Sequence, residues 1–337
     1  MAKMSIAEAL RQAIREEMQR DPRVFCVGED IGIKGGFGGA FTVTLGLSDE
    51  FGHERMLDTP ISETGIAGVA IGAAIAGLRP IADVQYGDFL FCMMDQLANQ
   101  AAKMTYMSGG TVKVPLVMRA PVGATSRGAQ HAQSLEAFFT HIPGLKVVAP
   151  STAYDAKGLL KSAVRDDNPV IVFEHKLLYG SKGPRTERGA LSPIGDVPDE
   201  EYLVPIGKGI IRRAGRDVTI VGKLLTMYRA LAAAEQLAQG GIEAEVIDPR
   251  TLVPLDKELI LESVRKTGRL VIVEEDNLTG GWAADIAAIV ADEAFFWLDA
   301  PIKRVSAPDT PAPFAPVMEQ FYVPSEERVI QAVRSLF

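Results

Sequence analysis

Short apolar runs alternate with longer helix-like segments along this chain, and this alternation limits the folds that it can adopt. Apolar runs of strand length lie at 24–28, 80–84, 114–118, 145–150 and 169–173, and again at 218–221, 244–247, 270–273 and 302–306. Most are separated by segments with the spacing of an amphipathic helix, and we expect a long helix near 88–107. Such alternation is typical of parallel sheets that carry helices on both faces. We therefore expect an α/β fold.

Residues 181–205 interrupt the alternation. They are rich in glycine, proline and charge, as in the stretch 183–188. Such composition is typical of a boundary between domains, and 337 residues are enough for two domains with cores of their own. The sequence predicts two parallel-sheet, three-layer domains at 1–180 and 206–337, joined by a linker at 181–205.

Composition excludes some classes of protein. The net charge is −8, which argues against nucleic-acid binding and a basic membrane surface. The longest apolar run, Ile66–Leu78, is shorter than the roughly 20 residues that span a bilayer, and we expect a buried helix there. Cys26 and Cys92 both lie in apolar runs and are expected to be buried thiols. Neither has metal-ligand spacing. The N-terminus enters a helix through the capping box Ser5–Glu8 and shows no signal-peptide core. Together with the scarcity of cysteine, this leads us to expect a cytoplasmic protein.

Several common catalytic motifs do not occur in this sequence. The glycine-rich stretch 31–41 lacks the dinucleotide fingerprint, since Phe41 stands where its third glycine is required. The sequence also has no Walker loop, no zincin motif and no nucleophile elbow. These absences exclude the common hydrolases and the dehydrogenases with their own NAD site.

Glu63 is the strongest candidate for chemistry. It lies just before the uncharged run Ile66–Leu78, and a carboxylate buried against such a run is costly to ionise. That favours an acid or base shared with a ligand. The alternative is a plain structural role, because acidic residues are common in the first turn of a helix.

The same run places small residues close to one helical face, namely Gly65, Gly68, Gly72 and Ala76. Small residues let another backbone approach closely. The partner could be another helix of this chain or a second subunit, and the sequence leaves both alternatives open.

Several segments together carry a family resemblance. They are Leu57–Pro80, Gly128–Ser134, Pro143–Pro150, Asp155–Lys161, Ile247–Asp256, Lys266–Leu270 and Leu298–Pro301. In this order and spacing they resemble the thiamine-diphosphate enzymes of the transketolase superfamily. More narrowly, they resemble the beta subunit of the decarboxylating first component of 2-oxo acid dehydrogenase complexes.

The resemblance implies roles for individual residues. Glu63 would bond to a ring nitrogen of the aminopyrimidine of thiamine diphosphate and so promote loss of the thiazolium proton. Phe89 would pack on that ring, with Tyr86 as a second candidate and Gln85 as a further contact. His131 would lie beside the reacting carbon and serve transfer to the lipoyl group. For Phe89 and His131 the alternatives are a core aromatic and a structural histidine; His53, His141 and His175 are taken as structural.

The resemblance also implies a potassium site formed by Leu116, Ala163, Val164, Asp166 and Asn168. Oxygen ligands suit such a hard cation. A simple turn after a helix is the alternative.

The superfamily binds the diphosphate through Mg²⁺ and a Gly-Asp-Gly motif, which this sequence lacks. The resemblance therefore implies that an alpha subunit binds Mg²⁺ and the diphosphate in an α2β2 heterotetramer. It also implies a dihydrolipoyl acyltransferase core as acceptor, docked on the C-terminal domain. The expected substrate is pyruvate or a branched-chain 2-oxo acid, with acetoin as an alternative. Two other functions are possible from the sequence: the C-terminal half of a split transketolase-like enzyme, and a non-catalytic α/β scaffold.

Overall fold

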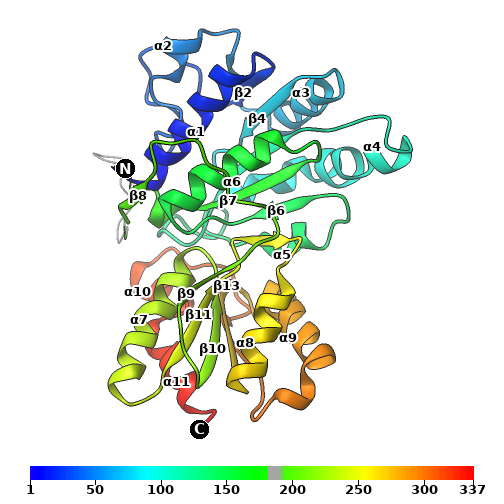
Figure 1. Ribbon diagram of the computed structural model, residues 1–337. Helices are drawn as coiled ribbons and strands as arrows, with labels where there is room; N and C mark the ends of the chain where they lie inside the picture. The colour runs from blue at the N-terminus through cyan, green and yellow to red at the C-terminus, as the bar shows by residue number, and fades with distance from the viewer. Residues whose placement is uncertain (181–190, 192) are drawn as a thin grey trace. The chain divides into compact units, whose positions relative to one another are not determined.

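The structure, a computed structural model, describes residues 1–180, 191 and 193–337. They form two compact units (Figure 1). The first unit contains Met1–Val122 and Phe138–Ile206, and the second contains Gly123–Ala137 and Gly207–Phe337. The stretch expected as a linker lies partly outside the described residues. Its described part includes β8 (Gly195–Val197), which pairs antiparallel with β1 (Ala2–Met4).

A parallel sheet forms the core of the first unit. Within this unit its strand order is β6-β7-β5-β4-β2-β3, and every neighbouring pair is parallel. The strands are β2 (Val24–Gly28), β3 (Met56–Asp58), β4 (Arg79–Asp83), β5 (Val117–Val122), β6 (Lys146–Val148) and β7 (Val170–His175). Every residue of β2, β5 and β7 is buried, which explains why these strands appear in the sequence as continuous apolar runs.

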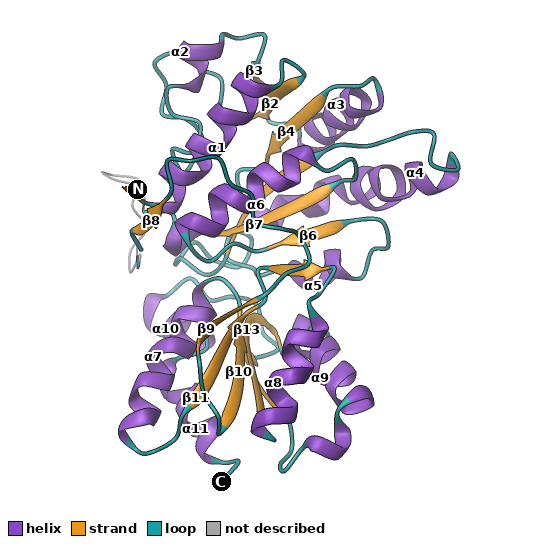
Figure 2. Cartoon of the chain, in the orientation of Figure 1, coloured by secondary structure: helices purple, strands orange, loops and turns teal. Residues whose placement is uncertain are grey.

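Helices cover both faces of this sheet (Figure 2). They are α1 (Ile6–Arg20), α2 (Leu47–Phe51), α3 (Glu63–Ile75), α4 (Ala102–Met107), α5 (Glu136–Thr140) and α6 (Ala153–Arg165). The predicted capping box at the start of α1 is confirmed, since the Ser5 hydroxyl accepts from the Glu8 amide. Ion pairs from Glu16 and Glu17 to Lys161 and Arg165 join α1 to α6.

The second unit holds a sheet of order β14-β13-β10-β11-β9. It is parallel except for β9, which runs antiparallel to β11. The strands of the unit are β9 (Ile210–Arg213), β10 (Val218–Gly222), β11 (Ala244–Asp248), β12 (Thr251–Val253), β13 (Leu270–Asn277) and β14 (Lys303–Ala307). The helices are α7 (Leu225–Gln239), α8 (Lys257–Thr267), α9 (Trp282–Glu293), α10 (Pro316–Tyr322) and α11 (Glu326–Arg334). Figure 1 shows α7 and α11 on one side of this sheet and α8 and α9 on the other. The predicted α/β fold with two mostly parallel sheets is confirmed.

Three local expectations are wrong. The long helix expected near 88–107 is broken into a 3₁₀ helix at Gly87–Met93, a π-helix at Asp95–Ala101 and the short α4. Cys92, expected to be a buried thiol, is exposed, whereas Cys26 is buried. The apolar helix α3 is buried on one face alone, because Gly68, Val69 and Gly72 are exposed. In the described part of the chain, no helix has the length and apolar character to cross a membrane.

Candidate functional site

The predicted cofactor residues follow neighbouring strands of the first sheet. Gln85, Tyr86 and Phe89 come directly after β4, and Glu63 begins α3 after β3. The strand β2 lies between β3 and β4 and pairs parallel with both. The carboxyl ends of parallel strands meet at one edge of a sheet, which is where ligands bind in open α/β folds.

Glu63 and Phe89 lie on elements that contact each other. The helix α3 packs against the 3₁₀ helix Gly87–Met93, which carries Phe89. Next to Glu63, the hydroxyl of Thr64 donates a hydrogen bond of 2.7 Å to the carbonyl of Cys92. Glu63 itself is half-buried rather than buried. The side chain therefore keeps a solvent-facing part, although its helix is fixed beside the aromatic segment.

Two half-buried aromatic rings lie in the same segment. The rings of Tyr86 and Phe89 make an edge contact with centroids 5.9 Å apart, and Phe41 makes a second edge contact with Tyr86. The ammonium of Lys176, which is buried after β7, lies 4.9 Å from the centre of the Tyr86 ring. A cation over a ring face fixes the ring in place. Tyr86 is therefore held on several sides, which suits a platform for a flat heterocycle.

Gln85 has both ends of its amide engaged. Its oxygen accepts from the backbone amide of Ala40 at 3.0 Å, and its nitrogen donates to the carbonyl of Glu29. Gln85, which follows β4, therefore contacts both Glu29, directly after β2, and Ala40 in the glycine-rich stretch 31–41. This arrangement supports a structural role at the site better than a direct contact with a ligand.

Glu63 is one of three carboxylates whose charges act on Glu29. Burial, followed by the negative charges of Asp30, Glu63 and Asp58, raises the pKa of Glu29. These carboxylates follow β2 and β3 and reach the same edge of the sheet. Like charges gathered in this way favour the protonated form of Glu29.

The turn after β4 is tightly packed against β5. A Cβ at Gly87 would lie 2.7 Å from the Val122 side chain and 3.0 Å from the carbonyl of Pro121. Only glycine fits where the two backbones approach this closely. The glycine thus sets the position of Tyr86 and Phe89 on either side of it.

A buried ionic network lies in the sheet just before this turn. Arg119 is 2% exposed and forms two hydrogen bonds with Glu174, of 2.8 and 2.6 Å, and an ion pair with Asp83. The Tyr179 hydroxyl also donates to Glu174. Burial raises the pKa of Asp83 to about 6, with Arg119 opposing the shift. The network joins β4, β5 and β7 just before their carboxyl ends.

His131 lies apart from these residues in the contact pattern. It follows β5 along the chain, but its segment Gly123–Ala137 belongs to the second unit. Its backbone amide donates to the carbonyl of Gly128 at 3.1 Å, and its side chain is half-buried. By contrast, His175 is buried and its Nδ1 accepts from the amide of Leu177, as expected for a structural histidine.

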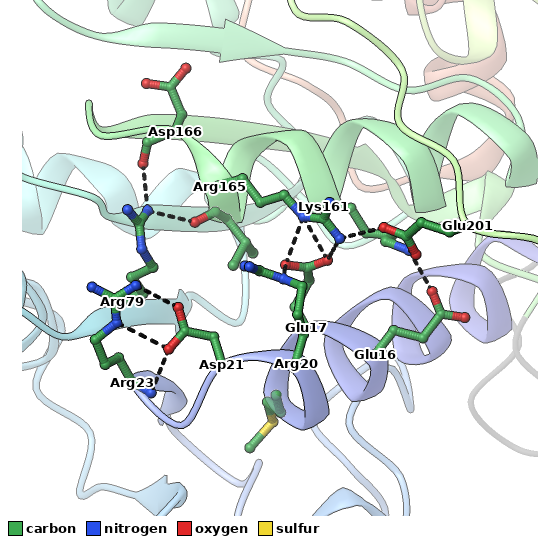
Figure 3. Close-up of polar contacts among 12 residues, drawn as sticks. Glu16, Glu17, Arg20, Asp21, Arg23, Arg79, Lys161, Arg165, Asp166 and Glu201 are labelled. Atoms are coloured by element: carbon green, nitrogen blue, oxygen red, sulfur yellow. Dashed lines mark hydrogen bonds and ion pairs between the residues drawn. The ribbon is translucent and has the colours of Figure 1, made fainter.

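The proposed potassium loop already contacts positive side chains (Figure 3). The guanidinium Nη1 of Arg79 donates to the carbonyls of Val164 and Asp166 at 2.9 and 3.0 Å. The ammonium of Lys146 pairs with the Asp166 carboxylate, which also accepts from Asn168. Two of the five predicted residues, Val164 and Asp166, thus share one positively charged group, the Arg79 guanidinium. Within residues 1–180, 191 and 193–337, no group of three or more His, Cys, Asp or Glu side chains is placed to hold a metal ion.

Sequence reasoning missed the residues that support the site. Glu29, Lys176 and the Arg119 network were not singled out, nor were Glu136 and Lys223 of the second unit. The sequence contained a usable pattern: Arg119 and Glu174 each stand inside an otherwise apolar strand. A charge in such a run is buried, and a buried charge requires a partner.

The two units together define a transketolase-type protein. The family "Transketolase, pyrimidine binding domain" matches residues 2–182, and "Transketolase, C-terminal domain" matches residues 207–329. Among solved structures, a "Split gene transketolase, inactive beta4 tetramer" superposes with a TM-score of 0.78, covering 99% of this chain and 98% of that chain. At 24% identity this likeness shows the fold alone.

Curated relatives give a narrower assignment. The chain is 47% identical to the 2-oxoisovalerate dehydrogenase subunit beta of Bacillus subtilis, covering 100% of this chain and 99% of the relative. It is 49% identical to the acetoin:2,6-dichlorophenolindophenol oxidoreductase subunit beta of Cupriavidus necator, with coverages of 98% and 97%. It is 48% identical to the pyruvate dehydrogenase E1 component subunit beta of Rickettsia felis, with coverages of 99% and 98%. The chain belongs to the family of 2-oxo acid dehydrogenase E1 beta subunits.

The ionic network around Arg119 predicts a pH-dependent defect. Arg119→Met leaves Asp83 and Glu174 buried without their cation, and we expect a loss of about 3–5 kcal/mol in the free energy of unfolding at pH 8. Without Arg119 to oppose the effect of burial, the pKa of Asp83 stays raised, so Asp83 in the folded variant holds a proton that the unfolded chain releases at about pH 4. Stability of the variant therefore falls as the pH rises. Urea denaturation at pH 5.5 and 8, with the unsubstituted chain as control, should show a smaller difference at pH 5.5. An equal difference at both values would contradict the proposed role of the network.

Proposed function

We propose that this chain is the beta subunit of a thiamine-diphosphate-dependent first component that oxidatively decarboxylates a 2-oxo acid and passes the acyl group to a lipoyl group. The observation that carries the proposal is the placement of Glu63 at the start of α3, a helix that packs against the 3₁₀ helix Gly87–Met93, where the half-buried ring of Phe89 contacts that of Tyr86. A carboxyl group next to aromatic faces is suited to a heterocycle that needs both a proton partner and a stacking surface.

The residues of this chain act on the pyrimidine end of the cofactor. Glu63 would bind a ring nitrogen of the bound cofactor and exchange a proton with it. Phe89 packs on the ring, with Tyr86 as the second candidate, and Gln85 holds the surrounding loops. Bound thiamine diphosphate supplies the electron sink for decarboxylation. Among the residues that follow the strands of the first unit, none matches the diphosphate motif of the superfamily.

The alpha subunit is proposed to bring Mg²⁺ and the diphosphate site. The exposed face of α3 supports such a partner: Val69 is 55% exposed, and a Cβ added at Gly68 or Gly72 would meet nothing within 4 Å in the described residues. Packing of this face within the chain, one of the two alternatives left by the sequence, is therefore not observed. We propose that the face meets a subunit in an α2β2 assembly, and that the acyltransferase core docks on the second unit.

The substrate is proposed to be pyruvate, with a branched-chain 2-oxo acid next. The chain is 47–49% identical to relatives named for 2-oxoisovalerate, acetoin and pyruvate. These three identities differ too little to decide between the three substrates. Cleavage of acetoin is accordingly the second candidate. A split transketolase is disfavoured, because the identity there is 24%. Both cysteines are free, which suits a reducing cytoplasm.

Activity should require assembly with the alpha subunit. The purified chain alone should bind thiamine diphosphate poorly and show no decarboxylation, because half of the site lies on the alpha subunit. Adding that subunit should restore both, as measured by calorimetry and by reduction of 2,6-dichlorophenolindophenol with pyruvate, 3-methyl-2-oxobutanoate and acetoin in turn. Full activity of the chain alone would refute the divided site, and the panel would identify the substrate.

Gly68→Leu tests whether the exposed face of α3 forms the interface with the alpha subunit. Leucine favours helices more than glycine does, and the side chain would enter open space, so the isolated chain should be as stable as before. Assembly with the alpha subunit should nevertheless be lost. A normal complex with this variant would show that the exposed face of α3 is not the interface.

Glu63→Gln should lower the turnover of the assembled enzyme by roughly 10²–10⁴, the usual scale for losing an acid or base. Glutamine keeps the size of the side chain but exchanges no proton at neutral pH. Glu54→Gln, at an exposed position, is the matched control and should be neutral. Turnover within a few-fold of normal for Glu63→Gln would leave Glu63 as a helix residue only.

We propose that the loop 163–168 also binds potassium, through the carbonyls of Leu116, Ala163, Val164, Asp166 and Asn168. Each carbonyl oxygen has two lone pairs, so the hydrogen bonds from Arg79 leave an acceptor site on Val164 and Asp166. Oxygen ligands of this kind suit a hard cation.

Potassium should therefore stabilise the chain. We expect the unfolding midpoint to rise when choline chloride is replaced by potassium chloride at equal ionic strength, by about 2–4 °C for each kcal/mol of binding free energy. Sodium chloride is the second control and should give a smaller rise. Identical midpoints in all three salts would mean that Arg79 and Lys146 supply all the positive charge that the loop requires.

A further inference from the structure

The segment Gly123–Ala137, called here the histidine segment, leaves β5 of the first unit but packs with the second unit. It carries His131. We propose that two residues of the second unit, Glu319 and Lys223, fix this segment at points on either side of His131 and thereby position the histidine for acyl transfer. This inference rests on the role of His131 in the proposed function.

The first anchor is Glu319 of α10. Its carboxylate accepts hydrogen bonds from the backbone amide of Ser126 and, at 3.1 Å, from the Ser126 hydroxyl. Ser126 has a φ of +56°, a conformation that few non-glycine residues adopt. A charged acceptor bonding to a backbone amide makes a strong hydrogen bond, and it offsets the cost of this conformation. Glu319 therefore holds the segment where its backbone turns.

Apolar packing supports the first anchor. Ala124 and Ala132 of the histidine segment are buried in one cluster with Ala307, Ala312 and Tyr322. Between Ala124 and Ala132, a Cβ added at Gly128 would lie 3.2 Å from the ring of Phe314. The segment between Ser126 and His131 is thus fitted closely to the surface of the second unit.

The second anchor is Lys223, at the carboxyl end of β10. Lys223 is 2% exposed, and its ammonium lies 2.9 Å from Oε1 of Glu136 and 3.1 Å from Oδ2 of Asp276 on β13. The Lys223 ammonium also lies over the ring of Trp282, 5.8 Å from the ring centroid. Burial raises the pKa of Glu136 to about 7, against the attraction of Lys223. Removing one partner from such a buried group is costly, so Glu136 is firmly held.

The two anchors act on His131 from both sides along the chain. Ser126 precedes it by five residues and Glu136 follows it by five. Within this short stretch the backbone amide of His131 donates to the carbonyl of Gly128. A catalytic group on a loop gains precision when both ends of the loop are fixed, since a misplacement of about 1 Å can cost 10²-fold in rate. We therefore assign Glu319 and Lys223 as positioning residues that act through the histidine segment.

The test uses the chain assembled with its alpha subunit and compares two reactions. Reduction of 2,6-dichlorophenolindophenol reports decarboxylation, and reductive acylation of a free lipoyl domain reports acyl transfer. Glu319→Ala should slow acylation by roughly 10–100-fold while dye reduction stays within about threefold. Glu319→Gln keeps an acceptor for Ser126 and should restore acylation to within about threefold. Met318→Ala, at the exposed neighbouring position on α10, is the matched control.

His131→Ala separates this inference from the proposed function. If His131→Ala alone leaves acylation unchanged, the role of His131 fails and with it the purpose of both anchors. If His131→Ala impairs acylation, the double variant with Glu319→Ala should be no worse than His131→Ala, because both act through one group. Additive losses would overturn the positioning role.

Amide hydrogen exchange gives a readout independent of activity. Glu319→Ala should speed exchange across 124–132 by at least tenfold, because the Ser126 amide loses its acceptor. The same variant should leave exchange in β10 and β13 unchanged. Unchanged exchange in the histidine segment would show that Glu319 does not hold it. Lys223 is tested in the same way with Lys223→Arg, which keeps the charge and should retain protection near Glu136.

Discussion

Parallel pairing of β3, β2 and β4 is the constraint on which the rest of the site depends. Because these strands run in the same direction, the segments that follow them reach one edge of the sheet. Glu29 follows β2, Glu63 follows the loop after β3, and Tyr86 and Phe89 follow β4. An acid, an acidic neighbour and two aromatic rings thus meet although they are far apart in sequence. A reversed central strand would send its segment to the opposite edge.

The apolar runs predicted most of the sheet strands. A strand that is buried on both faces is apolar along its whole length, so it can be identified without knowing which strands it pairs with. Val24–Gly28 and Val170–His175 are of this kind. The sequence failed where an outcome depends on distant contacts. The helix α3 has no polar stripe, yet one of its faces is exposed, since glycine and alanine bury little area of their own. Cys92 lies in an apolar stretch and is still exposed, because the helix expected at 88–107 breaks into three pieces.

The buried charges of Arg119 and its partners were harder to predict from the sequence than the candidate ligand-binding residues. Glu63 and His131 stand in segments with a recognisable family pattern, whereas the partner of a buried charge is set by the fold. Arg119 pairs with Asp83 from the adjacent strand β4 and Glu174 from the adjacent strand β7, on either side of β5. Their sequence separations of 36 and 55 give no hint of contact. A charge inside an apolar strand predicts that a partner exists, but only the strand order identifies it.

The histidine segment shows how a domain can control a residue that lies outside its own sequence. By chain order His131 belongs with β5, and by contacts it belongs with the C-terminal sheet. The charged residues that hold it, Lys223 and Glu319, come from the carboxyl end of β10 and from α10. Glu63 is positioned by the first sheet, and His131 lies in a segment that packs with the second unit. Under the proposed function, decarboxylation and acyl transfer would therefore depend on different folding units. Substitutions that loosen the second unit should therefore affect the later half of the reaction first.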